Sequence, residues 1–211
     1  AWPPTWAKYG NSTQAEVLQS VLTADIEKIQ DTIVNVDAVA FDAAVDIILE
    51  AETIYLVGVR SCEPLADFLH FYLNMIRGNI VLIKTTSVTE MFEQMIRINE
   101  KDAIIGISFP RYSMRTLKCM EYANNKSAEV IAITDSRNSP MSLYSSCNLL
   151  ARSDMTSIVD SLVAPMSVIN ALIVALCMKN KERVVQKLEE LNRVWSDYQV
   201  YNNDEINQLD E

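Results

Sequence analysis

Five short apolar segments constrain the fold of this chain more than any other feature of its sequence. They are rich in β-branched residues, and stretches of helical length separate most of them. Continuous apolar strands that alternate with helices are typical of a parallel sheet covered by helices on both faces. The sequence therefore predicts a doubly wound α/β domain with strands at "TIYLVG" (53–58), "NIVLI" (79–83), "DAIIGIS" (102–108), "EVIAIT" (129–134) and "CNLLA" (147–151).

Helical periodicity flanks the strand segments on both sides. Before the first strand, apolar residues recur at steps of three and four, at Leu18, Leu22, Ile26, Ile29, Ile33 and Val36. Thr13 can cap this helix, with Glu16 in the position of a capping box. We expect a second helix near 39–51 and two closing helices over 158–198, with a break at 179–183.

Composition narrows the classes of function. The chain has 211 residues, 49% of them hydrophobic and 22% charged, which suits one globular domain. Its formal net charge of -10 would repel a phosphate backbone, so we expect no nucleic-acid binding by this chain alone. The four cysteines, Cys62, Cys119, Cys147 and Cys177, lie far apart without metal-binding spacing. This spacing predicts reduced thiols in a cytoplasmic protein. We expect no metal and no cofactor.

One segment requires comparison with a membrane span. Residues 161–178 carry no charge, and their length is near the lower limit for a spanning helix. Pro165, Ser167 and Asn170 interrupt the apolar run. We therefore expect a helix buried in the core or in a subunit interface, and no membrane association. Residues 1–10 have Trp and Pro where a signal peptide would have its apolar core, so none is expected.

The candidate site lies in the turns that follow the strands, because ligands of doubly wound sheets bind outside the carboxyl ends of the strands. Each of four such turns contains Ser or Thr, and three contain Arg; the turns are 58–64, 84–90, 108–113 and 134–140. Helix N-termini surrounded by hydroxyls and guanidinium groups suit an anionic oxygen ligand, phosphate above all.

Arg111 is the strongest single candidate in these turns. Its planar guanidinium can hold a phosphate, with the hydroxyls of Ser108 and Ser113 beside it. A surface salt bridge is the alternative role for Arg111. Arg60, Ser61 and Ser87 are further candidates, although Ser61, Ser87 and Ser139 also stand where helix N-caps are expected, and Gly58 would allow a tight turn.

Four motifs resemble a known family. "GVRSCEPLA", "ISFPRYS", "AEVIAITDSRNSPM" and "IVDSLVAPMSVINALI", in this order, are similar to the sugar isomerase (SIS) domain, specifically the effector domain of RpiR-type transcriptional regulators. The likeness covers roughly residues 13–200. It implies a flavodoxin-like, three-layer αβα sandwich with a five-stranded parallel sheet, a homodimer or higher even oligomer, and a site for a phosphorylated sugar or amino sugar.

The resemblance also assigns residues and domains. It places the first phosphate-facing turn on Ser61 and Cys62 and the second on Ser108, Arg111 and Ser113. Many SIS domains have a Ser-x-Ser-Gly-x-Thr turn at the second position, where this chain has Pro and Arg. We expect leader helices in 1–50 that pack on the core, the SIS domain in 51–200 and an acidic tail in 201–211. RpiR-type regulators carry a helix-turn-helix domain before the SIS domain, and this sequence shows none. We therefore expect either the sensing portion of a longer protein, in which a separate domain binds DNA, or a protein that works without DNA.

Two functions of different class remain open at this point. The first is a phosphosugar sensor in a regulator of carbohydrate metabolism; the alternative is a sugar-phosphate isomerase or lyase. An isomerase needs a proton-transfer pair. The one histidine, His70, falls in mid-helix among apolar residues, and Glu63 and Glu90 suit helix N-termini, so no catalytic residue is assigned. A purely structural dimerisation module would leave the hydroxyls and arginines unexplained.

Overall fold

A five-stranded, all-parallel sheet forms the centre of the computed structural model, which describes residues 9–153 and 159–198. The strand order is β2-β1-β3-β4-β5. The sequence prediction of five parallel strands is confirmed, and every strand except β4 is one or two residues shorter than its apolar segment. The bounds are β1 Ile54–Gly58, β2 Ile80–Leu82, β3 Ala103–Ile107, β4 Glu129–Thr134 and β5 Cys147–Leu150.

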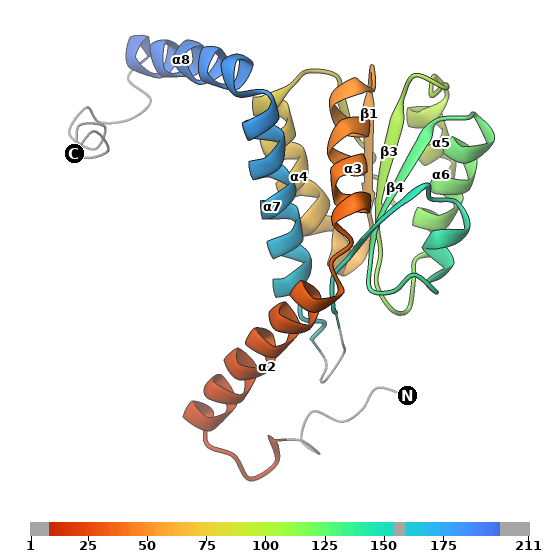
Figure 1. The fold of residues 1–211 in the computed structure, drawn as a ribbon. Coiled ribbons are helices and arrows are strands. Elements are labelled where there is room, and N and C mark those ends of the chain that lie inside the picture. The colour runs from red at the N-terminus through yellow and green to blue at the C-terminus, as the bar shows by residue number, and fades with distance from the viewer. Residues whose placement is uncertain (1–8, 154–158, 199–211) are drawn as a thin grey trace.

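Helices cover both faces of the sheet, which makes three layers (Figure 1). One face packs against α3 (Ala38–Glu50), α4 (Glu63–Ile76) and α7 (Val163–Lys179). The other packs against α5 (Val88–Met95) and α6 (Met114–Asn125). Every residue of β1 and β3 is buried, as expected for central strands with a helical layer on each side.

Two helices extend away from the sheet, α2 (Gln14–Asn35) and α8 (Lys181–Asp197), and Figure 1 shows them at opposite ends of the molecule. The predicted capping box of α2 is present: Thr13 N donates to Glu16 at 2.7 Å, and Glu16 N donates to Thr13 at 3.3 Å. The residues that α2 buries are Lys28 and Thr32, while Leu22 stays exposed. The expectation that the leader helices pack on the core therefore fits α3 better than α2.

The uncharged segment forms most of α7, and a single residue separates α7 from α8. One side of α7 is buried against the sheet and α4, whereas Val174 and Met178 are exposed. Among the described residues, no single helix is long and apolar enough to cross a membrane. The helices α7 and α8 meet that length and composition only when they are counted together, and the angle between them is 98°. The acidic tail expected over 201–211 lies outside the described residues.

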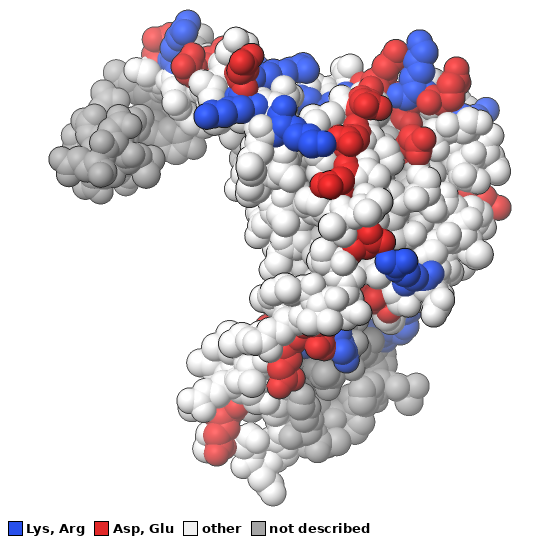
Figure 2. Space-filling view, in the orientation of Figure 1, with Lys and Arg blue, Asp and Glu red and all other residues white. Residues whose placement is uncertain are grey.

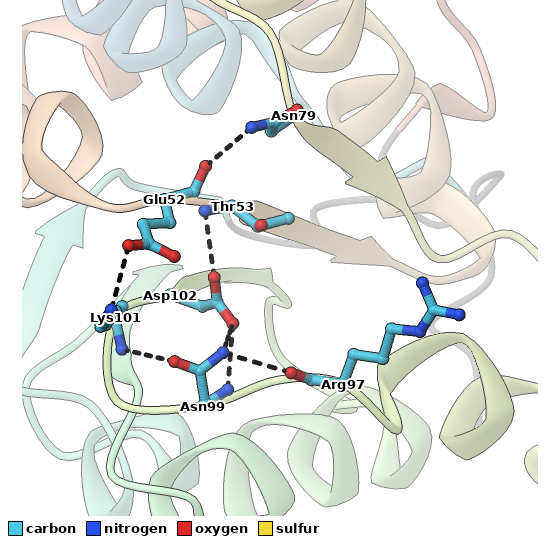
Figure 3. Close-up of polar contacts among 7 residues, drawn as sticks. All are labelled: Glu52, Thr53, Asn79, Arg97, Asn99, Lys101 and Asp102. Atoms are coloured by element: carbon cyan, nitrogen blue, oxygen red, sulfur yellow. Dashed lines mark hydrogen bonds and ion pairs between the residues drawn. The ribbon is translucent and has the colours of Figure 1, made fainter.

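A buried carboxylate fixes the amino edge of the sheet (Figure 3). Asp102 is 3% exposed and accepts hydrogen bonds from Thr53 N at 3.0 Å, Asn99 N at 3.0 Å and Asn99 Nδ2 at 2.8 Å. These bonds join the start of β1 to the loop before β3. Replacing Asp102 would leave these donors without their acceptor.

We predict that Asp102→Ala lowers the free energy of unfolding by about 3 kcal/mol, because several donors lose their acceptor at once. Lys101→Ala is the control: Lys101 pairs with Glu52 at 3.4 Å on the surface, so its loss should cost no more than about 0.5 kcal/mol. Urea unfolding followed by circular dichroism measures both. Equal losses in the two variants would contradict the prediction.

Candidate functional site

The turns that follow the central strands lie next to each other at the carboxyl edge of the sheet. β1 and β3 pair in parallel, and the register sets Gly58 opposite Ile107. The residues that follow these two positions, 59–62 and 108–113, therefore leave the sheet at neighbouring points. Parallel pairing thus brings the two turns predicted from sequence into one site.

The turn after β3 is built around a buried hydroxyl. Ser108 is 3% exposed, and its Oγ accepts a hydrogen bond from Ser113 N at 3.0 Å. The Ser113 Oγ in turn accepts from Thr116 N at 3.5 Å and caps α6. Between them, Arg111 adopts a positive φ of 66°, and its side chain is half exposed. The loop therefore closes on Ser108 and presents Arg111 outward.

The turn after β1 places its predicted residues at different depths. Arg60 and Ser61 are exposed in a short 3₁₀ helix, Arg60–Cys62, and Arg60 has a positive φ of 59°. Cys62 is buried, and burial raises the pKa of its thiol to about 11. A protonated, inward-facing thiol does not offer a reactive nucleophile. Cys62 is therefore part of the packing beneath the turn.

Both central turns contain an arginine in the left-handed region, which is uncommon for residues other than glycine. Such conformations cluster at ligand sites, where the surrounding structure stabilises them. Gly58 explains how the first turn stays close to α4: a Cβ there would lie 2.5 Å from the Cys62 carbonyl oxygen. Its φ is not positive, so close approach is the reason for glycine.

A carboxylate that the sequence analysis did not identify joins the two turns. Asp160 Oδ2 accepts a hydrogen bond from Ser61 Oγ at 3.4 Å, and Asp160 Oδ1 lies 3.8 Å from an Arg111 guanidinium nitrogen. The residue stands just before α7, a position where an aspartate is normally interpreted as a helix cap. No local pattern in the sequence could have indicated these contacts, since 99 residues separate Asp160 from Ser61.

Ser87 remains apart from this group. Its Oγ accepts from Glu90 N at 3.4 Å and caps α5, and its own N–H donates to Thr85 Oγ1 at 3.1 Å. Glu90 accepts a hydrogen bond from Thr85, so its side chain does not complete a capping box with Ser87. These contacts of Ser87 stay within its own turn, on the side of the sheet edge nearer β2.

The carboxyl edge continues across β4 and β5 as an open groove of about 640 Å³. Tyr112 OH donates to Asp135 Oδ1 at 2.7 Å and ties the β3 turn to the β4 turn. Burial and the hydrogen bond to Asp135 raise the pKa of the Tyr112 hydroxyl, so it stays a donor. The groove has mainly polar walls, formed by α2 and by the turns after β4 and β5: Asp31, Thr32, Val34, Asn35, Val36, Asp135, Ser136, Arg137, Leu150, Ala151 and Arg152.

Polar contacts hold α2 beside this edge. Ser161 Oγ donates to Asp25 Oδ1 at 2.6 Å, and Lys28 Nζ lies 3.5 Å from the same oxygen. Arg152 N donates to Thr32 Oγ1 at 2.9 Å, next to β5. These contacts explain why a lysine and a threonine are the buried residues of an otherwise apolar helix pattern.

Metal-ligand side chains do not cluster in the part of the chain that the structure describes. No three His, Cys, Asp or Glu side chains there come close enough to hold a metal ion. Figure 2 shows acidic and basic side chains interspersed on the visible face. The candidate site is therefore best described as a polar edge with hydroxyls and arginines, suited to an oxyanion.

The fold and the candidate site together define an α/β domain with a polar cluster at the carboxyl edge of a parallel sheet. The SIS domain family model matches residues 47–175, so the chain belongs to the SIS domain family. The structure is similar to the sugar isomerase domain of an RpiR transcription factor from Sphaerobacter thermophilus, with a TM-score of 0.80 and 26% identity over 84% of this chain and 99% of that one.

Two further proteins are similar to this chain. NanR of Vibrio vulnificus, solved in complex with ManNAc-6P, aligns with a TM-score of 0.75 and 16% identity over 91% of this chain and 72% of that one. The HTH-type transcriptional regulator TTE0211 of Caldanaerobacter subterraneus subsp. tengcongensis is 22% identical over 85% of this chain. The match spans 64% of that regulator's length.

We predict that Gly58→Ala destabilises the protein by about 1–3 kcal/mol, because the new methyl group would overlap the Cys62 carbonyl group in the first turn. Gly78→Ala is the matched control, since no atom lies within 4 Å of a Cβ at that position. Its effect should be neutral or slightly stabilising. Thermal unfolding of the two variants measures the difference, and similar melting temperatures would contradict the proposed close approach.

Proposed function

We propose that this chain is the phosphosugar-binding sensor domain of an RpiR-type transcriptional regulator of carbohydrate metabolism. The observation that carries the proposal is the convergence of Ser61 and Arg111, from neighbouring turns, on one anionic group at the carboxyl edge. Phosphate has the charge and the acceptor oxygens for the same donors. In this proposal Ser61, Ser108 and Arg111 bind the phosphate, with Arg60, Cys62, Ser87 and Ser113 shaping the turns.

The relatives support a ligand of this class. NanR was solved with an amino-sugar phosphate, ManNAc-6P, and the Sphaerobacter protein is a transcription factor. In our proposal the sugar ring lies in the open groove beside the turns after β4 and β5, where carboxylate, hydroxyl and guanidinium groups can bond to its hydroxyls. A phosphorylated sugar or amino sugar suits this edge, because its phosphate can bind the turns after β1 and β3 and its ring can bind the groove.

The arrangement favours binding over catalysis. His70 lies in the middle of α4, where its Nε2 is 2.9 Å from Asn74 Nδ2 of the same helix. Glu63 lies 3.2 Å from Lys84 Nζ, and Glu90 accepts from Thr85. Each candidate acid or base therefore has a partner: His70 and Glu90 within their own helix or turn, and Glu63 in the turn after β2. We propose that the domain binds its ligand without converting it.

Transmission to DNA would require a further domain. In the proposed regulator, a helix-turn-helix domain reads DNA and this cytoplasmic domain reports ligand occupancy. The net charge of -10 supports that division, because a strongly acidic domain contributes little to binding a phosphate backbone. The match to only 64% of TTE0211 is compatible with additional sequence in such a protein.

We predict that a thermal-shift panel of hexose and amino-sugar phosphates, ManNAc-6P included, identifies a stabilising ligand. At a hundred times Kd, a bound ligand stabilises the fold by about 2.7 kcal/mol. Arg111→Ala should weaken binding about ten- to a hundred-fold in titration calorimetry, because a charge-assisted hydrogen bond contributes about 1.5–3 kcal/mol. Its unfolding free energy should change little, since the side chain is half exposed.

Arg97→Ala is the matched control, because Arg97 is exposed at the opposite, amino edge of the sheet (Figure 3). It should keep wild-type affinity. Unchanged affinity in Arg111→Ala would remove the phosphate role of Arg111. Turnover of a sugar phosphate by the wild-type protein would establish the enzymatic alternative.

We also propose a homodimer or a higher even oligomer. The apolar side of α2 is exposed, as is the outer side of α7. Large exposed apolar patches are typical of protein interfaces. The exposed residues include Leu18, Leu22, Ile26, Ile33, Val174 and Met178. Leu22→Glu should raise the dissociation constant of the oligomer in sedimentation, while Leu143→Glu, at an exposed position away from α2 and α7, should not. A monomeric wild-type protein at micromolar concentration would contradict this proposal.

A further inference from the structure

We propose that Asp160 acts as an intramolecular competitor of the ligand phosphate, and that its displacement is transmitted to α2 through Ser161. This inference rests on the proposed function and names its regulation. Asp160 contacts one group from each of the two central turns, Ser61 and Arg111. Its carboxylate thus takes the place that an oxyanion ligand needs in order to reach both turns at once.

The geometry makes this contact easy to replace. The Arg111–Asp160 separation of 3.8 Å is long for an ion pair, and the Arg111 side chain is 49% exposed. The hydrogen bond from Ser61 is also long, at 3.4 Å. Partly exposed pairs of this kind contribute little to stability, so a phosphate with about -1.5 to -2 charges competes well against a single carboxylate.

Asp160 also opposes the ligand while it stays nearby. A carboxylate and a phosphate that share Arg111 repel each other, and this repulsion increases at a partly dehydrated site. Occupancy therefore favours a position of Asp160 away from Arg111. The Asp160 side chain is only 25% exposed and lies between the turns and the start of α7. If it takes a new position, the neighbouring residues of the chain must therefore move as well.

The next residue connects this movement to α2. Ser161 Oγ donates to Asp25 Oδ1 at 2.6 Å, and the Ser161 carbonyl oxygen accepts from Ser153 Oγ at 3.0 Å, at the end of β5. Asp25 also pairs with the buried Lys28 at 3.5 Å. Two consecutive residues, 160 and 161, therefore join the ligand turns, β5 and α2.

The consequence is a coupling between ligand occupancy and α2. In the free protein, Asp160 lies on Arg111 and Ser161 holds Asp25. When phosphate takes Arg111, residue 160 withdraws and the Ser161–Asp25 hydrogen bond is lost. By linkage, any change that releases α2 also strengthens ligand binding. Since α2 extends away from the sheet, its release would change the position of a helix outside the core of the fold (Figure 1).

The first test measures affinity. Asp160→Asn removes the competing charge and should bind ManNAc-6P and inorganic phosphate about ten-fold more tightly than wild type. Asp160→Glu keeps the charge and should stay near wild-type affinity. Asp46→Asn is the control for net charge, because Asp46 pairs with Lys179 at the other end of α7. Titration calorimetry with ManNAc-6P and thermal shifts with phosphate give the values.

The second test measures α2 directly in the wild-type protein. Hydrogen exchange in the segment 22–32 should become faster when ManNAc-6P is bound. Ser161→Ala should show fast exchange already without ligand, no further change with it, and tighter binding than wild type.

The outcomes separate this inference from the proposed function. If neither wild type nor Asp160→Asn binds a sugar phosphate or phosphate, the proposed function fails. If both bind with equal affinity, Asp160 is not a competitor and the site assignment stands. If exchange in α2 is unaffected by a ligand that does bind, the coupling through Ser161 is wrong.

Discussion

The parallel pairing of β1 with β3 is the constraint on which the rest of the structure depends. Because both strands run in the same direction and lie at the centre, their turns must leave the sheet side by side. Helices cover both faces, so only the edges of the sheet remain open to a ligand. The amino edge is closed by Asp102 and its partners, which leaves the carboxyl edge as the candidate site.

The sequence predicted the sheet because its information is local. Apolar runs of strand length, helical periodicity and the Thr13–Glu16 capping box each occupy a few neighbouring residues, and each appears in the structure as expected. The positions of Arg111 and Ser108 could be predicted for the same reason, since the site of a parallel sheet follows from its strand ends. The assignment of these residues to a ligand remains a prediction.

Two features could not be predicted from the sequence. Asp160 reaches the site only through contacts between distant segments, and the polar attachment of α2 depends on Asp25 and Ser161, which are 136 residues apart. The hydroxyls were ambiguous for another reason, because capping and ligand binding need the same side chain at the same position. The structure distinguishes them: Ser87 and Ser113 accept from helix N–H groups, whereas Ser61 contacts Asp160.

The attachment of α2 differs in kind from that of the other helices near the sheet. The helices α3, α4 and α7 bury apolar side chains in a continuous core, where any displacement would open cavities at a high cost in free energy. Along α2, which also lies against α7, the buried side chains are Lys28 and Thr32, and water or another partner can replace their polar contacts. A helix held in this way can change position at a small cost while the sheet stays intact. The same helix exposes its apolar side, so a change in its position would alter the surface through which we propose that two copies associate.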